Sequence, residues 1–245
     1  MTLKEINSEF DILYNNISSG AAPNFNEYEK SLFLTKAQDE LVRMYYSGKN
    51  SHYDSFESDE EVRRYLDTLI VTYKTNLSNH QSYGSFKDYV VSKPNDMLYV
   101  VREIAQNASK GCLNGFIMQV IPITHEDLNN VLNDPFKRPN ERKVIRYDDS
   151  VNNQVQFHLL SKDELSNYTI VYLKKPNPII LIDLKDFGED ENGDSEYTIN
   201  GQSDPSIPEI PEILQHKVIA RAVELAKSAY VGDLHTTFAV NSRDL

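Results

Sequence analysis

The residues with the most potential for chemistry form an acidic run between Asp183 and Ser195. Within this run, Asp186-Phe187-Gly188 has the sequence of the metal-binding triplet of protein kinases. The chain lacks the glycine-rich loop, the lysine strand and the His-Arg-Asp loop that give this triplet its role. The carboxylates that have the chemistry to collect a hard cation such as calcium are Asp186, Glu189, Asp190, Asp194 and Glu196. Their spacing does not match an EF-hand loop, so a solvated acidic turn is favoured, and cation binding by residues 183–195 stays open.

The other residue types that perform catalysis are scattered. The six histidines are His52, His80, His125, His158, His216 and His235. None has HExxH spacing or lies beside a cysteine pair, which disfavours zinc. The sequence contains neither a G-x-S-x-G nucleophile motif nor a phosphate-binding P-loop. We therefore predict no catalytic residue, no cofactor and no metal ligand, and we interpret the lone thiol of Cys112 as inert.

Basic residues cluster locally in an acidic chain. The 37 acidic and 25 basic residues give a net charge of -12, so the surface as a whole should repel phosphate backbones. The cluster consists of Lys137, Arg138, Arg142, Lys143 and Arg146. Contact with DNA phosphates is one interpretation. Because the fifteen tyrosines favour protein interfaces, we prefer an inter-subunit basic patch that faces acidic surface on a neighbour.

Both ends of the chain have helical periodicity. Apolar residues at steps of three and four predict a helix from the Thr2-x-x-Glu5 capping box to Gly20, and a second from about Asn24 to Gly48. A third is predicted from Ser58-x-x-Glu61 through Tyr73. A last helix should begin at Pro211 and end at Gly232.

The middle of the chain changes to short segments rich in β-branched and aromatic residues, which predict strands. These segments are MLYVVREI, GFIMQVIPI, KVIRY, VQFHLL, YTIVYL and PIILI. One short helix, His125 to Leu132, is expected between them, with Thr124 as its cap. The predicted fold class is α+β, with a helical bundle-like element and a C-terminal helix around a central antiparallel sheet or small barrel.

The predicted organisation has four parts. They are an N-terminal helical part (1–80), a β-rich part with one short helix (81–204), a C-terminal helix that returns to the helical part (205–232) and an extended tail (233–245). The apolar tail residues that could dock on a partner are Leu234, Phe238, Val240 and Leu245, although a frayed terminus fits equally well. No signal peptide and no 18-residue apolar stretch are present, so neither export nor membrane insertion is expected.

Four segments carry a family resemblance: residues 26–42, 122–139, 168–181 and 211–226. Together they resemble the head-to-tail connector, or neck ring, proteins of crAss-like bacteriophages that infect gut Bacteroidetes. The resemblance implies a virion protein, assembled in the host cytoplasm, that forms a ring commonly of about twelve copies between portal and tail. It also implies contacts with the portal and other neck or tail proteins, and a lumen through which genomic DNA passes without specific binding. A non-viral interaction scaffold and an enzyme of unknown class remain as alternatives.

Overall fold

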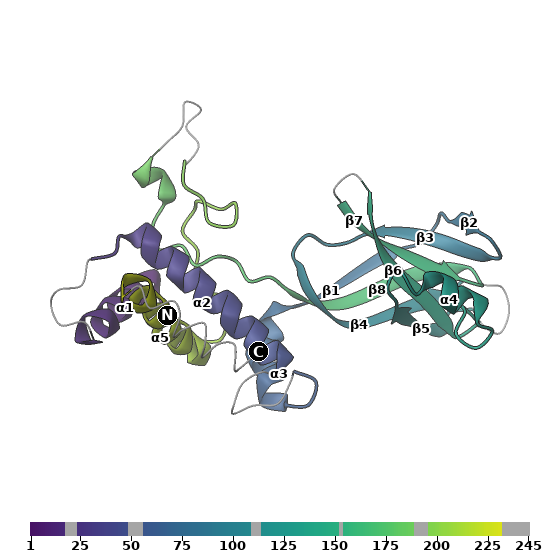
Figure 1. The fold of residues 1–245 in the computed structure, drawn as a ribbon, viewed down its shortest axis with the longest axis horizontal. Coiled ribbons are helices and arrows are strands. Elements are labelled where there is room, and N and C mark those ends of the chain that lie inside the picture. Colours follow the sequence, from purple (N-terminus) through teal and green to yellow (C-terminus); the bar gives the residue numbers. More distant parts are fainter. Residues whose placement is uncertain (18–23, 49–55, 109–113, 152–153, 189–195, 232–245) are drawn as a thin grey trace. The chain divides into compact units, whose positions relative to one another are not determined.

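The structure is a computed structural model that describes residues 1–17, 24–48, 56–108, 114–151, 154–188 and 196–231. These residues divide into two compact units (Figure 1). Unit 1 combines Met1–Leu69 with the chain from Lys175 onward, and unit 2 is Ile70–Lys174. Unit 1 is mainly helical and unit 2 is mainly sheet, which confirms the predicted α+β class.

Of the predicted helix ends in unit 1, Gly20 and Gly232 lie outside the described residues, and the second helix is capped by Asn26 rather than by Asn24. The unit is built on three long helices. They are α1 (Leu3–Ile17), α2 (Glu27–Ser47) and α5 (Glu212–Val231), and both α1 and α2 pack on α5. The Thr2 backbone N–H donates to Glu5 at 2.7 Å and the Glu5 N–H donates to the Thr2 hydroxyl at 3.3 Å, which completes the first capping box. Gly48 ends α2 with φ 68°, a left-handed conformation that glycine adopts without strain.

The start of α2 provides a direct test of these caps. Asn26 accepts a hydrogen bond from the Glu29 N–H at 2.8 Å, and the Asn26 N–H donates to the Glu29 side chain at 2.9 Å. Asn26→Ala removes the acceptor, so we expect a loss of about 1 kcal/mol in the free energy of unfolding of unit 1. Urea denaturation followed by far-UV circular dichroism measures this loss. Asn26→Ser, which keeps a capping oxygen, should lose less than half as much.

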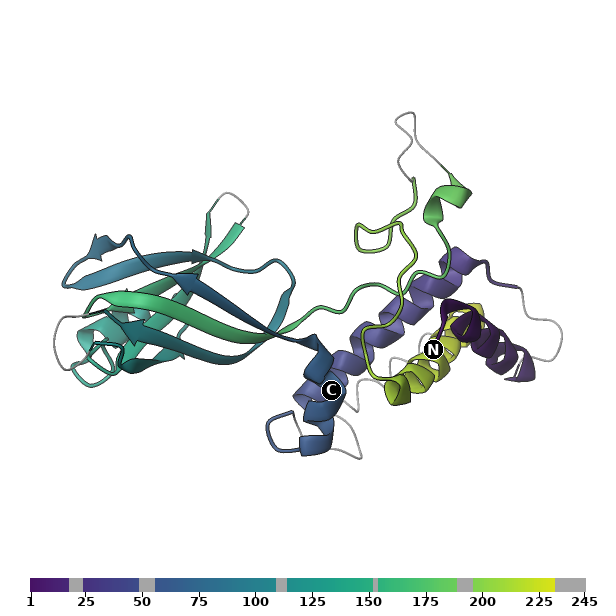
Figure 2. The same cartoon turned by 180° about the vertical axis from the view of Figure 1, so that it is seen from behind.

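An extended segment of unit 1, residues 177–181, lies along α2 (Figure 2). Polar side chains of α2 hold it. The Ile179 N–H donates to the Thr35 hydroxyl at 3.1 Å, and the Leu181 N–H donates to the Ser31 hydroxyl at 3.0 Å. The Gln38 amide donates to the carbonyl of Asn177 at 2.8 Å. The prediction of a strand at PIILI was therefore wrong, because Ile179 and Leu181 donate to side chains of α2 and the segment has only an isolated antiparallel bridge, between Ile180 and Ser206.

The third predicted helix is present, but its cap is Asp59 rather than Ser58, and it ends earlier than predicted. Helix α3 (Glu60–Leu66) begins after Asp59, whose side chain accepts from the Glu61 N–H at 2.8 Å. A 3₁₀ turn, η1 (Asp67–Leu69), follows, and residues 70–76 form strand β1. Pairing with a strand about 100 residues away accounts for the difference, since Ile70 lies opposite Leu173.

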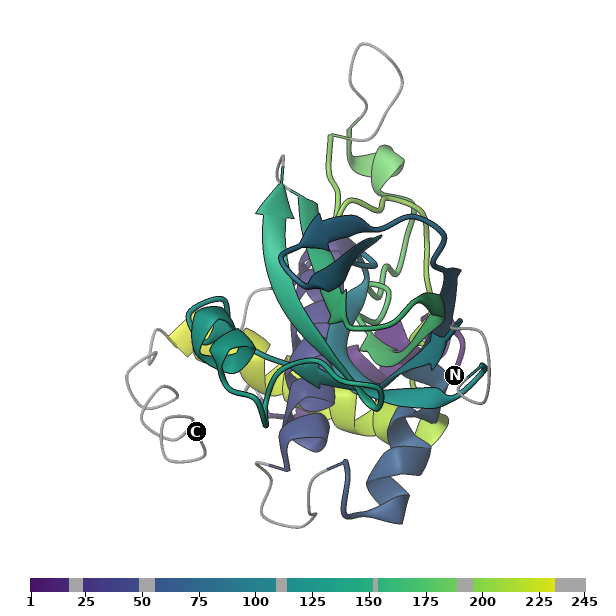
Figure 3. The ribbon, with the colours of Figure 1, turned by 90° about the vertical axis from the view of Figure 1, so that its right-hand side faces the viewer.

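Unit 2 is one eight-stranded sheet that curls strongly (Figure 3). Its strands are β1 (Ile70–Asn76), β2 (Gln81–Tyr83), β3 (Phe86–Ser92), β4 (Met97–Asn107), β5 (Ile117–Pro122), β6 (Lys143–Val151), β7 (Gln154–Ser161) and β8 (Leu165–Lys174). The order is β1-β8-β4-β5-β6-β7-β3-β2. All pairs are antiparallel except β5 with β6, which are parallel because a helical crossover joins them. Three register shifts between β4 and β8 are consistent with the curl, since bulges bend a sheet.

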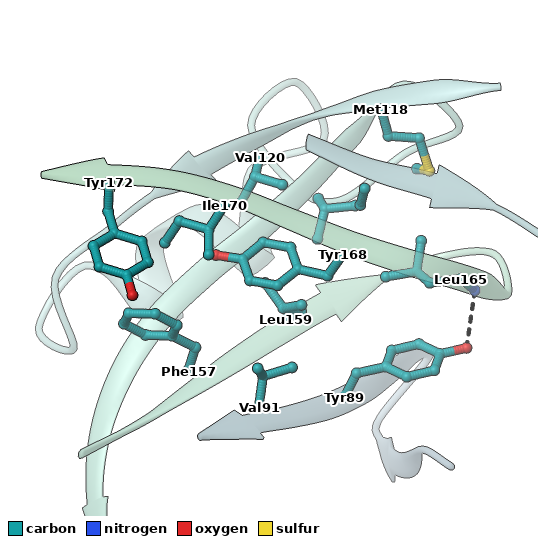
Figure 4. Close-up of a cluster of buried hydrophobic side chains, with 12 residues drawn as sticks. Tyr89, Val91, Met118, Val120, Phe157, Leu159, Leu165, Tyr168, Ile170 and Tyr172 are labelled. Atoms are coloured by element: carbon teal, nitrogen blue, oxygen red, sulfur yellow. Dashed lines mark hydrogen bonds between the residues drawn. The ribbon is translucent and has the colours of Figure 1, made fainter. Parts of the chain in front are cut away.

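The curled sheet buries one face in a continuous core (Figure 4). Alternate residues of β7 and β8, such as Phe157, Leu159 and Tyr168, point into this core and are fully buried. The Tyr89 hydroxyl closes one end by accepting from the Leu165 N–H at 3.0 Å.

The opposite face of the sheet is covered in part by α4 (Leu128–Asn133), through Leu128 packed with Ile145 and Leu160. This helix begins later than predicted. Thr124 does not cap it; the Thr124 hydroxyl donates to the Asp127 side chain at 3.0 Å, within a turn that precedes the helix. The short helix between strands is confirmed, and only its first turn differs.

Candidate functional site

The loop between α4 and β6, residues 134–143, carries an exposed aromatic side chain. We call this loop the Phe136 loop. Phe136 is 87% exposed, the highest value among the large apolar side chains that the structure describes. The Asp134 side chain accepts from the Phe136 N–H at 2.9 Å, and the Asp134 carbonyl accepts from the Arg138 N–H at 3.0 Å. At the other end, the Lys143 ammonium donates to the Phe136 carbonyl at 3.0 Å. The loop thus holds Phe136 in a defined position without burying its ring.

The predicted basic patch is divided by the structure. Lys137, Arg138 and Arg142 are exposed in the Phe136 loop, whereas Lys143 is half-buried by its contact with the loop backbone. Arg146 is only 9% exposed and does not share this surface. A surface patch can therefore use the three exposed cations, and inter-subunit pairing of that patch remains a prediction.

Arg146 belongs instead to a polar network inside unit 2. Its guanidinium pairs with Glu103 on β4 and with Asp148 at 3.3 Å, and it lies 4.6 Å from the centre of the Phe157 ring. The Tyr168 hydroxyl donates to the Glu103 carboxylate at 2.8 Å. Burial raises the pKa of Glu103, and the positive charge of Arg146 opposes that rise. The network is structural, because Glu103 is shielded from solvent.

A second exposed aromatic group lies in unit 1, where the 3₁₀ turn η2 (Leu184–Phe187) meets α2. Tyr28, Phe187 and Tyr197 form a cluster with ring centres 5.2 to 6.5 Å apart. Phe187 is 38% exposed and Tyr197 is 40% exposed. The carboxylates of Asp186 and Glu196 are exposed at its edge. We call these five residues the aromatic–acidic surface.

Residues 188 and 196 fix this surface in place. The Glu196 N–H donates to the Gly188 carbonyl at 3.0 Å, and a Cβ on residue 188 would approach the Glu196 carboxylate and the Tyr197 ring to 3.0 and 3.4 Å. Gly188 therefore permits the side chains of Glu196 and Tyr197 to pack closely against the backbone at this position. Glu189, Asp190 and Asp194 lie outside the described residues, and the described part contains no group of three His, Cys, Asp or Glu side chains able to hold a metal ion.

The histidines that the structure describes serve in packing. His158 Nδ1 lies 2.9 Å from Asp88 Oδ2, and its ring stacks on Tyr147 at 4.8 Å between centres. Burial raises the pKa of Tyr147 to about 12, with the charge of Asp88 adding to the rise. His216 Nδ1 lies 2.8 Å from Glu9 Oε1 at the surface of unit 1. None of these contacts places a nucleophile beside a base.

A cavity of about 280 Å³ lies between α1 and the start of α2, where Lys30 pairs with Asp11 at 2.8 Å. The partner-docking residues of the tail (Leu234, Phe238, Val240 and Leu245) and Cys112 fall outside the described residues. Among the helices that the structure describes, none is long and apolar enough to cross a bilayer.

Comparison with known proteins decides the family. The family described as "Phage tail ring protein 3/4" matches residues 1–237. The chain belongs to this family. It is 37% identical over 232 residues to "Ring protein 3" of Bacteroides phage crAss001, covering 92% of this chain and 95% of the relative. It is 34% identical over 249 aligned residues to "Ring protein 4/5" of the same phage, covering 99% of each. The resemblance to crAss-like phage ring proteins is thereby confirmed.

The basic residues of the Phe136 loop could be identified from the sequence, but the aromatic residue that precedes them was missed. The available signal was a phenylalanine between Pro135 and Pro139 in a basic stretch, where neither strand nor helix could bury it. The aromatic–acidic surface was also missed, because its three rings are separated by up to 169 positions.

Proposed function

We propose that this chain is a structural subunit of a phage particle that assembles into a ring in the neck, between portal and tail. The observation that carries the proposal is the family match over residues 1–237, supported by two ring proteins that align along nearly their whole length. In this role the chain makes and breaks no bonds. Copies of the chain, about twelve, bury surface against two neighbours each in a contact that closes on itself.

The charge of the chain fits a passage for DNA. A net charge of -12 disfavours retention of phosphate backbones, so a genome can cross the ring without being held. The non-viral scaffold has no support from the family, and the enzyme has none from the described side chains.

The tail provides the contact with the next part of the neck in this proposal. Deleting residues 233–245 should leave the rest of the chain folded and weaken binding to the portal about tenfold or more, since an apolar arm would be lost. Circular dichroism checks the fold, and a pull-down with purified portal protein measures binding. A tail of the same composition in scrambled order is the matched control and should bind as weakly as the deletion. Equal portal binding by the wild type, the deletion and the scrambled variant would exclude the tail as the portal-binding segment.

A further inference from the structure

We infer that the Phe136 loop of one copy binds the aromatic–acidic surface of the next copy. The inference rests on the proposed ring and names the two surfaces that meet within it. One surface is basic and lies in unit 2, and the other is acidic and lies in unit 1, so every copy carries both.

The Phe136 loop has the properties of an interface anchor. Aromatic side chains that fill a partner's surface contribute most of the binding energy of many interfaces. The loop backbone donates hydrogen bonds to Asp134 and accepts one from Lys143, so binding requires little further ordering. Four basic and two acidic residues between positions 134 and 143 make the loop positive within an acidic chain.

The aromatic–acidic surface is complementary to the Phe136 loop both in its aromatic rings and in its charge. Phe187 and Tyr197 offer ring faces and edges that can receive the Phe136 ring of another copy in an offset or edge-on arrangement. Asp186 and Glu196 offer carboxylates to Lys137 and Arg138 at the rim. Tyr28 connects this surface to the interior of unit 1, because it packs against the buried cluster of Ile180, Leu184 and Ile199.

A second copy is the occupant that the charges favour. The chain carries 12 more negative than positive charges, so an acidic partner is available to the loop in every neighbouring copy. The two surfaces differ, so their contact is heterologous and passes from copy to copy until the ring closes. A contact of two identical surfaces would stop at a dimer.

Charge reversal tests the pairing. The first variant is Lys137→Glu, Arg138→Glu and Arg142→Glu, and the second is Asp186→Lys and Glu196→Lys. Each full-length variant alone brings like charges together, so we expect self-association, measured by sedimentation velocity, to weaken about tenfold or more. Mixing the two variants should restore association, since each then meets a surface of opposite charge. Restoration on mixing requires a contact between copies and cannot come from a contact within one chain.

Matched controls separate this contact from a general charge effect. Lys4→Glu, Arg64→Glu and Lys74→Glu changes the net charge as much as the first variant does, at exposed positions elsewhere, and should leave association within about twofold of the wild type. Phe136→Ser should weaken association without any change of charge. Ile207→Ser, at a residue that is 59% exposed, is the apolar control and should have little effect. Circular dichroism confirms that each variant is folded.

Three results would overturn the inference. The first is charge-reversal or Phe136→Ser variants that self-associate as strongly as their controls. The second is a mixture of the two charge-reversal variants that associates as weakly as either variant alone. The third is a wild-type chain that remains monomeric at about 1 mM. None of them removes the chain from the virion ring, which imaging of the particle tests separately. Failure of the contact and failure of the proposed function are therefore distinguishable.

Discussion

Replacing Arg146 with methionine is expected to lower the free energy of unfolding of unit 2 by about 3 to 5 kcal/mol. The Glu103 side chain is only 4% exposed, and Arg146 supplies its opposite charge. Methionine fills much of the same volume but leaves the carboxylate buried with the Tyr168 hydroxyl as its remaining partner in the network. Urea denaturation, with hydrogen exchange on β4 and β8 to report on unit 2, measures the loss.

The pH dependence of this variant tests whether the buried charge is responsible. Burial raises the pKa of Glu103 above its usual value, so the folded state binds this proton more tightly than the unfolded state. Stability tied to such a group falls as pH rises through the folded pKa and is regained on acidification. Without Arg146 the pKa of Glu103 should rise further. The deficit at about pH 7 should therefore shrink toward about pH 5.

The matched control removes both charges. Arg146→Met combined with Glu103→Leu should recover most of the stability, because replacing both partners of a buried pair leaves no orphan charge. A single variant that loses less than about 1 kcal/mol, or whose deficit is the same at both pH values, would contradict this account.

Removing two hydroxyls from α2 should have the next largest effect. Ser31→Ala with Thr35→Val leaves the N–H groups of Leu181 and Ile179 without their acceptors, and both hydroxyl-bearing residues are buried. A buried donor left unsatisfied costs about 1 to 3 kcal/mol. We therefore expect the free energy of unfolding of unit 1 to fall by about 2 to 6 kcal/mol.

Hydrogen exchange locates that effect. The amides of residues 179 and 181 should exchange faster in the double variant, whereas amides in the middle of α5 should change only as far as global stability changes. Thr35→Ser keeps the acceptor and serves as the control, with the Ile179 amide still protected. Equal protection of residues 179 and 181 in wild type and double variant would show that water or another group replaces the hydroxyls.

The helices of unit 1 could be predicted because their determinants are local. The capping boxes at Thr2 and Asn26 and the stop at Gly48 lie within a few residues of the ends that they define. Strand β1 could not be predicted in this way, since its pairing with β8 joins positions about 100 residues apart. PIILI has the composition of a strand, but the acceptors for the Ile179 and Leu181 N–H groups are on a helix 140 or more residues earlier in the chain.

The candidate surfaces likewise depend on contacts between residues that are distant in the sequence. Lys137, Arg138 and Arg146 look equivalent in a count of charges, but Arg146 lies on β6, where successive side chains point to opposite faces. Its side chain follows Val144 into the buried face and pairs with Glu103. The exposed Phe136 follows from the loop around it, which the sequence indicated only through two prolines.

The most direct test of the central claim, that the chain is a building block of a phage ring, is cryo-electron microscopy of purified virions of the phage that carries it. We expect the density to identify this chain as a closed ring of repeated copies between portal and tail. Virions that lack the chain, or that contain it only as isolated copies outside any ring, would show that it is not a ring subunit.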